Sequence, residues 1–98
     1  MGKTPDSVVL EARLDAAGAD SLRTVLLERI ELDGDIILDA SEVSLIDTPA
    51  VHVLLGAARS CDARGKAMKL DRPSEPFLEA FQILGLDTEI QNWGIANV

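Results

Sequence analysis

The chain has 98 residues, and 9 basic against 17 acidic side chains give it a formal charge of −8 with the single histidine neutral. Apolar residues make up 47% and charged residues 27%, a globular composition in a length that supports one domain. The negative charge argues against nucleic acid and anionic membranes as partners, because both require clustered basic residues, and it leaves a basic protein surface as a partner.

The first third of the chain predicts a strand followed by a helix. Residues 8–14 are apolar and then alternating, which is typical of a strand. Small residues predict a connection over 15–20, after which Asp20 or Ser21 is expected to cap a helix. Its apolar residues recur at helical spacing, and it is expected to end near 32–34.

A second strand and the clearest helix follow. Residues 35–39 form a short apolar run between acidic residues, typical of a strand covered on both faces. Thr48 and Pro49 predict the next helix start, because threonine is a good N-cap and proline suits the first helical position. Gly65 is the expected C-terminal stop. The apolar stripe of this helix comprises Val51, Leu54, Leu55, Ala58 and Cys61.

The last third predicts a strand over 66–71 and a helix capped by Ser74 and ended by Gly85. The expected buried face of this helix comprises Phe77, Leu78, Phe81 and Leu84. Residues 87–98 leave two alternatives, a final strand or an extended arm, which would pack Ile90, Trp93 and Ile95. Alternation of strands and helices predicts an α/β domain with a mostly parallel sheet.

Residues suited to catalysis are sparse. His52 is the only histidine and is placed off the apolar stripe, so an exposed surface histidine is favoured over a catalytic base or metal ligand. Cys61 is the only cysteine, which predicts no intramolecular disulfide, and its place on the buried stripe favours a structural thiol. Neither glycine-rich phosphate-binding pattern is present. We therefore expect no enzyme, no cofactor and no metal site.

Membrane and export signals are also missing from the sequence. No window approaches the roughly 20 consecutive apolar residues of a membrane-spanning helix. The first residues lack the apolar segment of a signal peptide. We expect a cytoplasmic protein that does not insert into a membrane.

The one suggestive site is the junction 41–50, where a strand leads into a helix whose start carries an acidic residue and a hydroxyl. A conventional helix cap explains this pattern without any function. The functional alternative is a loop at which a partner binds and Thr48 is phosphorylated. A phosphate would add about 1.5 to 2 negative charges beside Asp47 and would release a docked partner by repulsion.

Several segments in this order resemble the STAS domain, the fold of bacterial anti-sigma factor antagonists. They are Leu38-Asp39-Ala40-Ser41, Ile46-Asp47-Thr48-Pro49-Ala50, Val53-Leu54-Leu55, Pro73-Ser74-Glu75-Pro76-Phe77 and Leu84-Gly85-Leu86. The resemblance covers about residues 8–90. It implies one STAS-like α/β domain over 1–98, with residues 91–98 as a tail, about four mostly parallel strands, and helices packed largely on one side.

The resemblance also implies a regulatory protein that binds a protein partner, such as an anti-sigma-type serine kinase or another ATPase subunit. The usual family motif is Asp-Ser-Ser-Gly, with the second hydroxyl as phosphoacceptor. Asp47 and Thr48 match its first two positions, whereas proline occupies the acceptor position. Thr48 is therefore the main phosphorylation candidate, with Ser41 and Ser44 as weaker ones. The expected partner contacts are Asp47, Thr48, Pro49, Ala50 and His52.

Two alternatives stay open beside this phosphorylation switch. Asp-Thr at this point also resembles the STAS subunit of phospholipid-transport ABC complexes, and residues 73–81 resemble stand-alone STAS proteins of chemotaxis clusters. Either resemblance implies a constitutively docked subunit with no phosphate transfer. The alternative from another class is a small enzyme that uses Asp47, Thr48 and His52.

Overall fold

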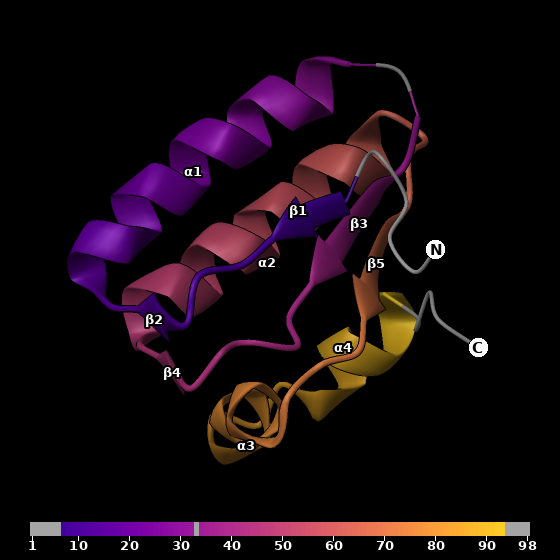
Figure 1. The fold of residues 1–98 in the computed structure, drawn as a ribbon. Coiled ribbons are helices and arrows are strands. Elements are labelled where there is room, and N and C mark those ends of the chain that lie inside the picture. Colours follow the sequence, from indigo (N-terminus) through magenta and orange to yellow (C-terminus); the bar gives the residue numbers. More distant parts are fainter. Residues whose placement is uncertain (1–6, 33, 94–98) are drawn as a thin grey trace.

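The structure is a computed structural model that describes residues 7–32 and 34–93 (Figure 1). In chain order its elements are β1 (Ser7–Val9), β2 (Arg13–Leu14), α1 (Ala16–Glu31), β3 (Ile36–Asp39), β4 (Leu45–Ile46), α2 (Thr48–Ala63), β5 (Met68–Asp71), α3 (Glu75–Ile83) and α4 (Asp87–Trp93). Every strand pairing among these residues is parallel, as the alternating pattern predicts. The α/β fold is confirmed.

The strands divide between a three-stranded sheet, in the order β1-β3-β5, and a separate pair, β2-β4. The strand expected over 8–14 is therefore two strands that belong to different sheets. In the larger sheet Leu38 lies between Val8 and Leu70, and Asp39 lies beside Asp71 at the carboxyl end. Strand β4 of this pair is separated from α2 by a single residue, so the β2-β4 pair lies at the start of that helix.

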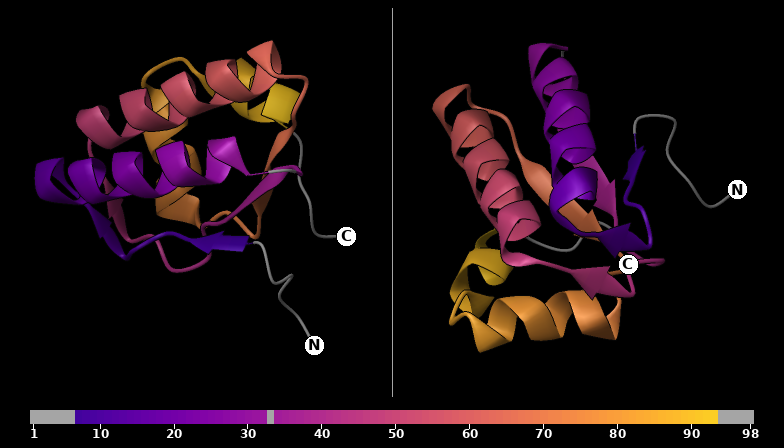
Figure 2. Two further views of the ribbon diagram at one scale, coloured as in Figure 1. Left: turned by 90° about the horizontal axis from the view of Figure 1, so that it is seen from above. Right: turned by 90° about the vertical axis from the view of Figure 1, so that its left-hand side faces the viewer.

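Helices α1 and α2 pack against each other along their length and cover one face of the strands (Figure 2). In the right-hand view of Figure 2 both lie above the β2-β4 pair, whereas α3 lies below it. Helix α3 contacts β4, and α4 contacts both α3 and β5. The start of α2 is thereby placed between β4 and α3.

Helix α1 begins earlier than predicted. Its N-cap is Asp15, whose side chain accepts a 2.9 Å hydrogen bond from the backbone N–H of Gly18, and not Asp20 or Ser21. Gly18 therefore lies in the first turn of the helix and not in a connection. A Cβ at this position would lie 3.0 Å from the carbonyl oxygen of Arg13, so the glycine allows the helix to start close against β2.

The predicted apolar stripe of α2 lies in the core, where Val51, Leu54 and Cys61 are almost fully buried. On α3 the pattern is only partly correct. Phe77 and Phe81 are buried with ring centroids 5.0 Å apart, but Leu78 and Leu84 are 38% and 44% exposed. These two leucines were wrongly predicted to be buried, because the buried face of this short helix is narrower than the apolar pattern suggests.

The segment after Gly85 forms neither a strand nor an extended arm as far as Trp93. It forms α4, which extends past residue 90 into the predicted tail and buries Ile90 and Trp93. The Trp93 ring packs edge-on against Phe81, with centroids 5.5 Å apart. Ile95, the third apolar residue predicted to pack there, lies outside the described residues.

Candidate functional site

The junction between β4 and α2 is fixed by its backbone. The Asp47 N–H donates a 2.9 Å hydrogen bond to the Leu14 carbonyl of β2, and the Asp47 carbonyl accepts a 3.1 Å bond from Val51 inside α2. Asp47 is thus the N-cap and Thr48 is the first residue of the helix. The prediction that Thr48 is the cap is wrong, because the chain turns into the helix one residue earlier.

The start of α2 presents an electropositive end to solvent. The Asp47 side chain makes no capping hydrogen bond, and the first turn contains no acidic residue. Pro49 has no N–H, but the other backbone N–H groups of the first turn point out of the helix without a partner inside it. They form the positive end of the dipole of this 16-residue helix. Such an end favours a negatively charged group nearby, including a phosphate.

The three candidate hydroxyls differ in how they are bonded. Ser41 donates to the buried Asp39 carboxylate at 2.7 Å, and Ser44 donates to the Ala12 carbonyl at 3.0 Å. The Thr48 hydroxyl is exposed and makes no hydrogen bond with any residue that the structure describes. Phosphorylation of either serine would break an existing hydrogen bond, whereas phosphorylation of Thr48 would break none with the described residues.

Most of the predicted contact residues lie together on the surface. Asp47, Thr48, Pro49 and His52 are exposed, and Thr48 and His52 lie one turn apart on the same side of α2. The prediction that Ala50 contacts the partner is wrong, because its side chain is fully buried beneath the first turn of the helix.

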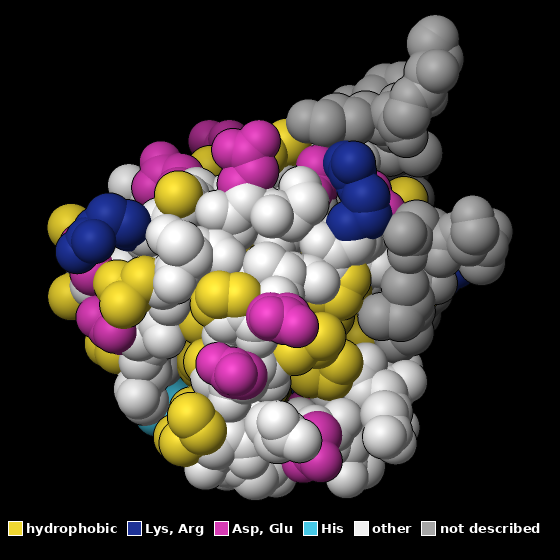
Figure 3. Space-filling model, turned by 60° about the horizontal axis from the view of Figure 1, so that its bottom comes forward, with side chains coloured by type: hydrophobic (Ala, Val, Ile, Leu, Met, Phe, Trp, Pro, Cys, Tyr) yellow, Lys and Arg dark blue, Asp and Glu magenta, His cyan; other side chains and the backbone are white. Residues whose placement is uncertain are grey.

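A shallow groove borders this surface on the side of α3. It has a volume of about 220 Å³ and lies between Asp47 and Thr48 on one side and Ala80, Ile83 and Leu84 on the other. Ile83 is 83% exposed. Figure 3 shows this lower face of the molecule, on which hydrophobic and acidic side chains alternate. An apolar rim thus adjoins the exposed hydroxyl.

Sequence reasoning missed this contribution of α3. A signal was nonetheless present, because Ile83 is two residues beyond Phe81 and so falls off the face that Phe77 and Phe81 bury. A single exposed apolar residue is common on protein surfaces, so Ile83 gains its significance from lying across the groove from Thr48.

Behind the junction, the loop that leads to β4 is held by charged groups. Asp39 is 1% exposed and accepts hydrogen bonds from the Ser41 backbone N–H at 3.0 Å and from Arg72 Nη2 at 3.0 Å. Arg72 Nε lies 3.6 Å from the Asp71 carboxylate, so this one guanidinium bridges the ends of β3 and β5. The arrangement fixes the loop without leaving a charge buried alone.

Comparison with known proteins decides the family. A family profile described as "Mlab, STAS domain" matches residues 2–92. The chain belongs to the STAS domain family. Proteins with this domain are in general binding modules and not catalysts. No curated protein matches the chain significantly.

Solved STAS structures overlay well on this one. A sulfate transporter family protein from Wolinella succinogenes superposes with a TM-score of 0.77 at 22% identity, over 95% of this chain and 77% of the other. The anti-sigma factor antagonist SpoIIAA in its unphosphorylated form gives 0.72 at 26% identity, over 96% and 83%. Phosphorylated SpoIIAA from Bacillus gives 0.70 at 26% identity, over 96% and 86%.

The described residues contain no group of three or more histidine, cysteine, aspartate or glutamate side chains that could hold a metal ion. None of the described helices combines the length and the apolar character that a membrane crossing needs.

Proposed function

We propose that this STAS domain is a bacterial regulatory protein that binds another protein through the start of α2. It would act as a single module over 1–98. We call this contact area the switch surface, and it comprises Asp47, Thr48, Pro49 and His52 with Ile83 of α3 and its C-cap residue Leu84. The observation that carries the proposal is the exposed Thr48 hydroxyl, which forms no hydrogen bond with a described residue. It lies at the positive end of α2, beside a groove whose far side is apolar.

The partner that fits best is an ATPase, either a serine kinase of the anti-sigma type or another nucleotide-binding subunit. SpoIIAA, which is 26% identical over 96% of this chain, has been solved in both phosphorylated and unphosphorylated forms. The net charge of −8 suits docking on a basic protein surface.

Phosphorylation of Thr48 would end the docking. The Thr48 oxygen would form the new bond to the γ-phosphorus of ATP, ADP would leave, and the hydroxyl proton would pass to the partner's base. The added charge of about −1.5 to −2 would be tolerated by the helix end but would lie beside Asp47 and at the rim of the groove. A partner seated there would meet both repulsion and new bulk.

The test of phosphorylation is incubation with a candidate kinase and ATP, read by intact mass. The expected result is a gain of one phosphoryl group that persists in Ser41→Ala and Ser44→Ala and is lost in Thr48→Val. Phosphate that remains on the Thr48→Val protein would show that Thr48 is not the acceptor.

The test of release is partner binding by matched variants. Thr48→Asp adds a negative charge. Thr48→Asn introduces a side chain of nearly the same shape as aspartate but adds no charge. We expect the aspartate variant to bind at least about tenfold more weakly and the asparagine variant to stay close to the wild type. Equal binding by both variants would contradict electrostatic release.

One observation favours a second function, that of a constitutively docked subunit in a transporter or chemotaxis ATPase assembly. Pro49, which cannot accept phosphate, occupies the usual acceptor position of the family motif. In that case the protein stays unmodified while its partner hydrolyses ATP, and intact mass measured during turnover separates the two functions.

An enzyme that uses Asp47, Thr48 and His52 is the least supported alternative. Among the described residues no side chain forms a hydrogen bond with the Thr48 hydroxyl, so no base is placed to activate it. Any turnover that survives in a variant lacking both Thr48 and His52 would remove these residues from an active site.

A further inference from the structure

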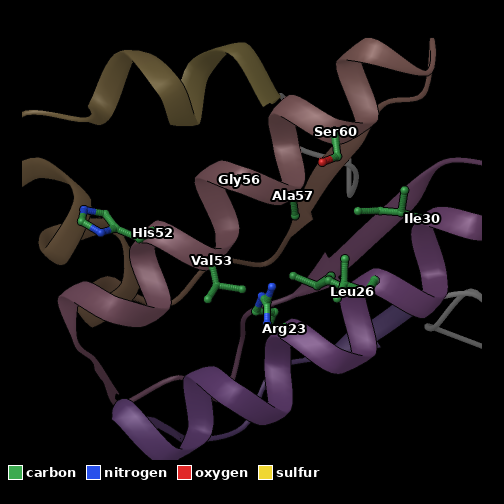
Figure 4. Close-up of a pocket in the computed structure, with 9 residues that line it drawn as sticks. Arg23, Leu26, Ile30, His52, Val53, Gly56, Ala57 and Ser60 are labelled. Atoms are coloured by element: carbon green, nitrogen blue, oxygen red, sulfur yellow. The ribbon is translucent and has the colours of Figure 1, made fainter.

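A second and larger groove runs between α1 and α2, away from α3 (Figure 4). Its volume is about 350 Å³, and we call it the α1–α2 groove. Leu26 and Ile30 of α1 face Val53 and Ala57 of α2 across it, and Arg23 extends from α1 into the same space. The groove is therefore mostly apolar, with a cation at its wall.

Gly56 is an unusual residue in the α2 wall of this groove. It lies in the middle of α2, where glycine lowers helix stability relative to alanine. Its backbone does not require glycine, because its φ is not positive and a Cβ there would meet no atom within 4 Å. Nothing in the described fold explains the missing side chain. The space above Gly56 is explained if another backbone approaches α2 closely at this point.

The charge of the α1–α2 groove is opposite to that of the whole protein. Among the described residues that line it, Arg23 and His52 are the only titratable ones, and none is an aspartate or a glutamate. Arg23 forms no ion pair with any residue that the structure describes, whereas Arg64 and Arg72 are paired. In a chain with a charge of −8, an exposed arginine without an ion pair to any described residue thus lies beside an apolar groove.

We propose that the α1–α2 groove binds an amphipathic helix of a partner protein, whose aliphatic side chains enter the groove and whose acidic side chain pairs with Arg23. A helix is the form that fits, because two helices form the walls and no strand edge borders the groove to pair with an extended peptide. This site does not depend on Thr48 and so goes beyond the switch surface, with which it shares only His52.

Two synthetic helical peptides of about five turns serve as probes. Both carry leucine at every third or fourth position, and their flanking positions hold glutamate in one peptide and lysine in the other. Net charge alone favours the lysine peptide. The groove predicts the reverse, namely that at physiological salt the glutamate peptide binds at least about tenfold more tightly and shifts the amide signals of residues 53–57.

Variants locate the binding to this groove. Gly56→Leu should abolish binding by filling the groove, and Gly56→Ala should weaken it while raising the Tm by about 4 °C, so that unfolding cannot explain the loss. Arg23→Glu should weaken the glutamate peptide about fivefold, whereas Arg59→Glu, an equal charge change on α2 outside the groove, should stay within about twofold. Thr48→Asp should bind the peptide normally, even if it fails to bind the partner of the switch surface.

Three results would overturn the proposal. They are tighter binding of the lysine peptide, unchanged binding by Gly56→Leu, and self-association that Gly56→Leu abolishes while neither peptide binds. The last result would assign the groove to a second copy of this chain.

Discussion

The Ser74 hydroxyl donates a 2.6 Å hydrogen bond to the carbonyl of Val43, 31 residues earlier in the chain. The same oxygen accepts the N–H of Phe77 at 3.3 Å and so caps α3. The Ser74 backbone N–H also donates to the Ala40 carbonyl at 3.1 Å. One residue therefore starts α3 and holds the loop that leads to the switch surface, so the two sides of the groove beside Thr48 are linked.

This double role predicts an unequal effect of two substitutions. Ser74→Ala removes both hydrogen bonds and should lower the free energy of unfolding by about 2 kcal/mol. Ser74→Asp can still accept from Phe77 but cannot donate to Val43, so it should lose about 1 kcal/mol. Urea unfolding measures both values, with Ser74→Thr as the control that retains both bonds. Wild-type stability in Ser74→Asp would mean that the bond to Val43 contributes nothing.

Two N-cap aspartates in this chain differ in one respect that a measurement can isolate. The Asp15 side chain accepts a hydrogen bond from Gly18, whereas the Asp47 side chain makes no capping bond. Asp15→Ala should therefore cost about 1 kcal/mol of stability, and Asp47→Ala less than about half of that. Thr48→Ala should stay within about 0.5 kcal/mol, since Thr48 is not the cap.

Thermal and urea unfolding of these three variants check the assignment. Asp15→Asn is the control, because its side-chain oxygen can still accept the hydrogen bond from the Gly18 N–H. A loss on Thr48→Ala as large as that on Asp15→Ala would contradict Asp47 as the N-cap.

The cap signals show why local sequence predicted some boundaries and not others. Ser74 was predicted correctly because a serine preceding an acidic residue and a proline is an N-cap signal that needs no tertiary information. The start of α1 was missed because Gly18 reads as a turn residue. The glycine is needed there because a Cβ at position 18 would lie only 3.0 Å from the Arg13 carbonyl oxygen, and only the folded chain shows this.

Helix α4 was missed for a related reason. In its seven residues only Ile90 and Trp93 are buried, too few to show a helical period, and its stability depends on the contact of Trp93 with Phe81. The exposure of Asp47, Thr48, Pro49 and His52 was predicted correctly, because it follows from their place off the apolar stripe of α2. The contribution of α3 to the groove beside Thr48 could not be predicted from the sequence, because tertiary packing places this helix there.

Arg72 combines an ion pair with a strained backbone, and the two effects can be separated. Its φ of 50° lies in the left-handed region, which costs a residue with a Cβ about 1 kcal/mol or more. Arg72→Ala keeps this strain and removes the bond to the buried Asp39, so it should lose about 2 kcal/mol of stability. Arg72→Gly removes both and should lose about 1 kcal/mol less.

Urea unfolding of the two Arg72 variants provides the comparison, with Arg72→Lys as the control that keeps a positive charge and the strain. Equal losses for the alanine and glycine variants would show that the backbone at this position is relaxed.

Cys61 provides a prediction about pH. Its side chain is 1% exposed, and burial raises the pKa of the thiol, although the nearby Lys66 acts in the opposite direction. Native protein should therefore react slowly with iodoacetamide at pH 8 and rapidly once it is unfolded in urea. Because the unfolded thiol ionises from about pH 8.5 while the folded thiol stays protonated, the unfolded state binds fewer protons above that pH.

Stability should consequently fall as pH rises above about 8.5, until the folded thiol ionises as well. Cys61→Ala removes this contribution, so the difference in free energy of unfolding between wild type and variant should shrink over that range. Urea unfolding from pH 7 to pH 10 measures the difference. A constant difference, or fast alkylation of the native protein, would place the Cys61 thiol in contact with water and contradict its burial between α2 and the sheet.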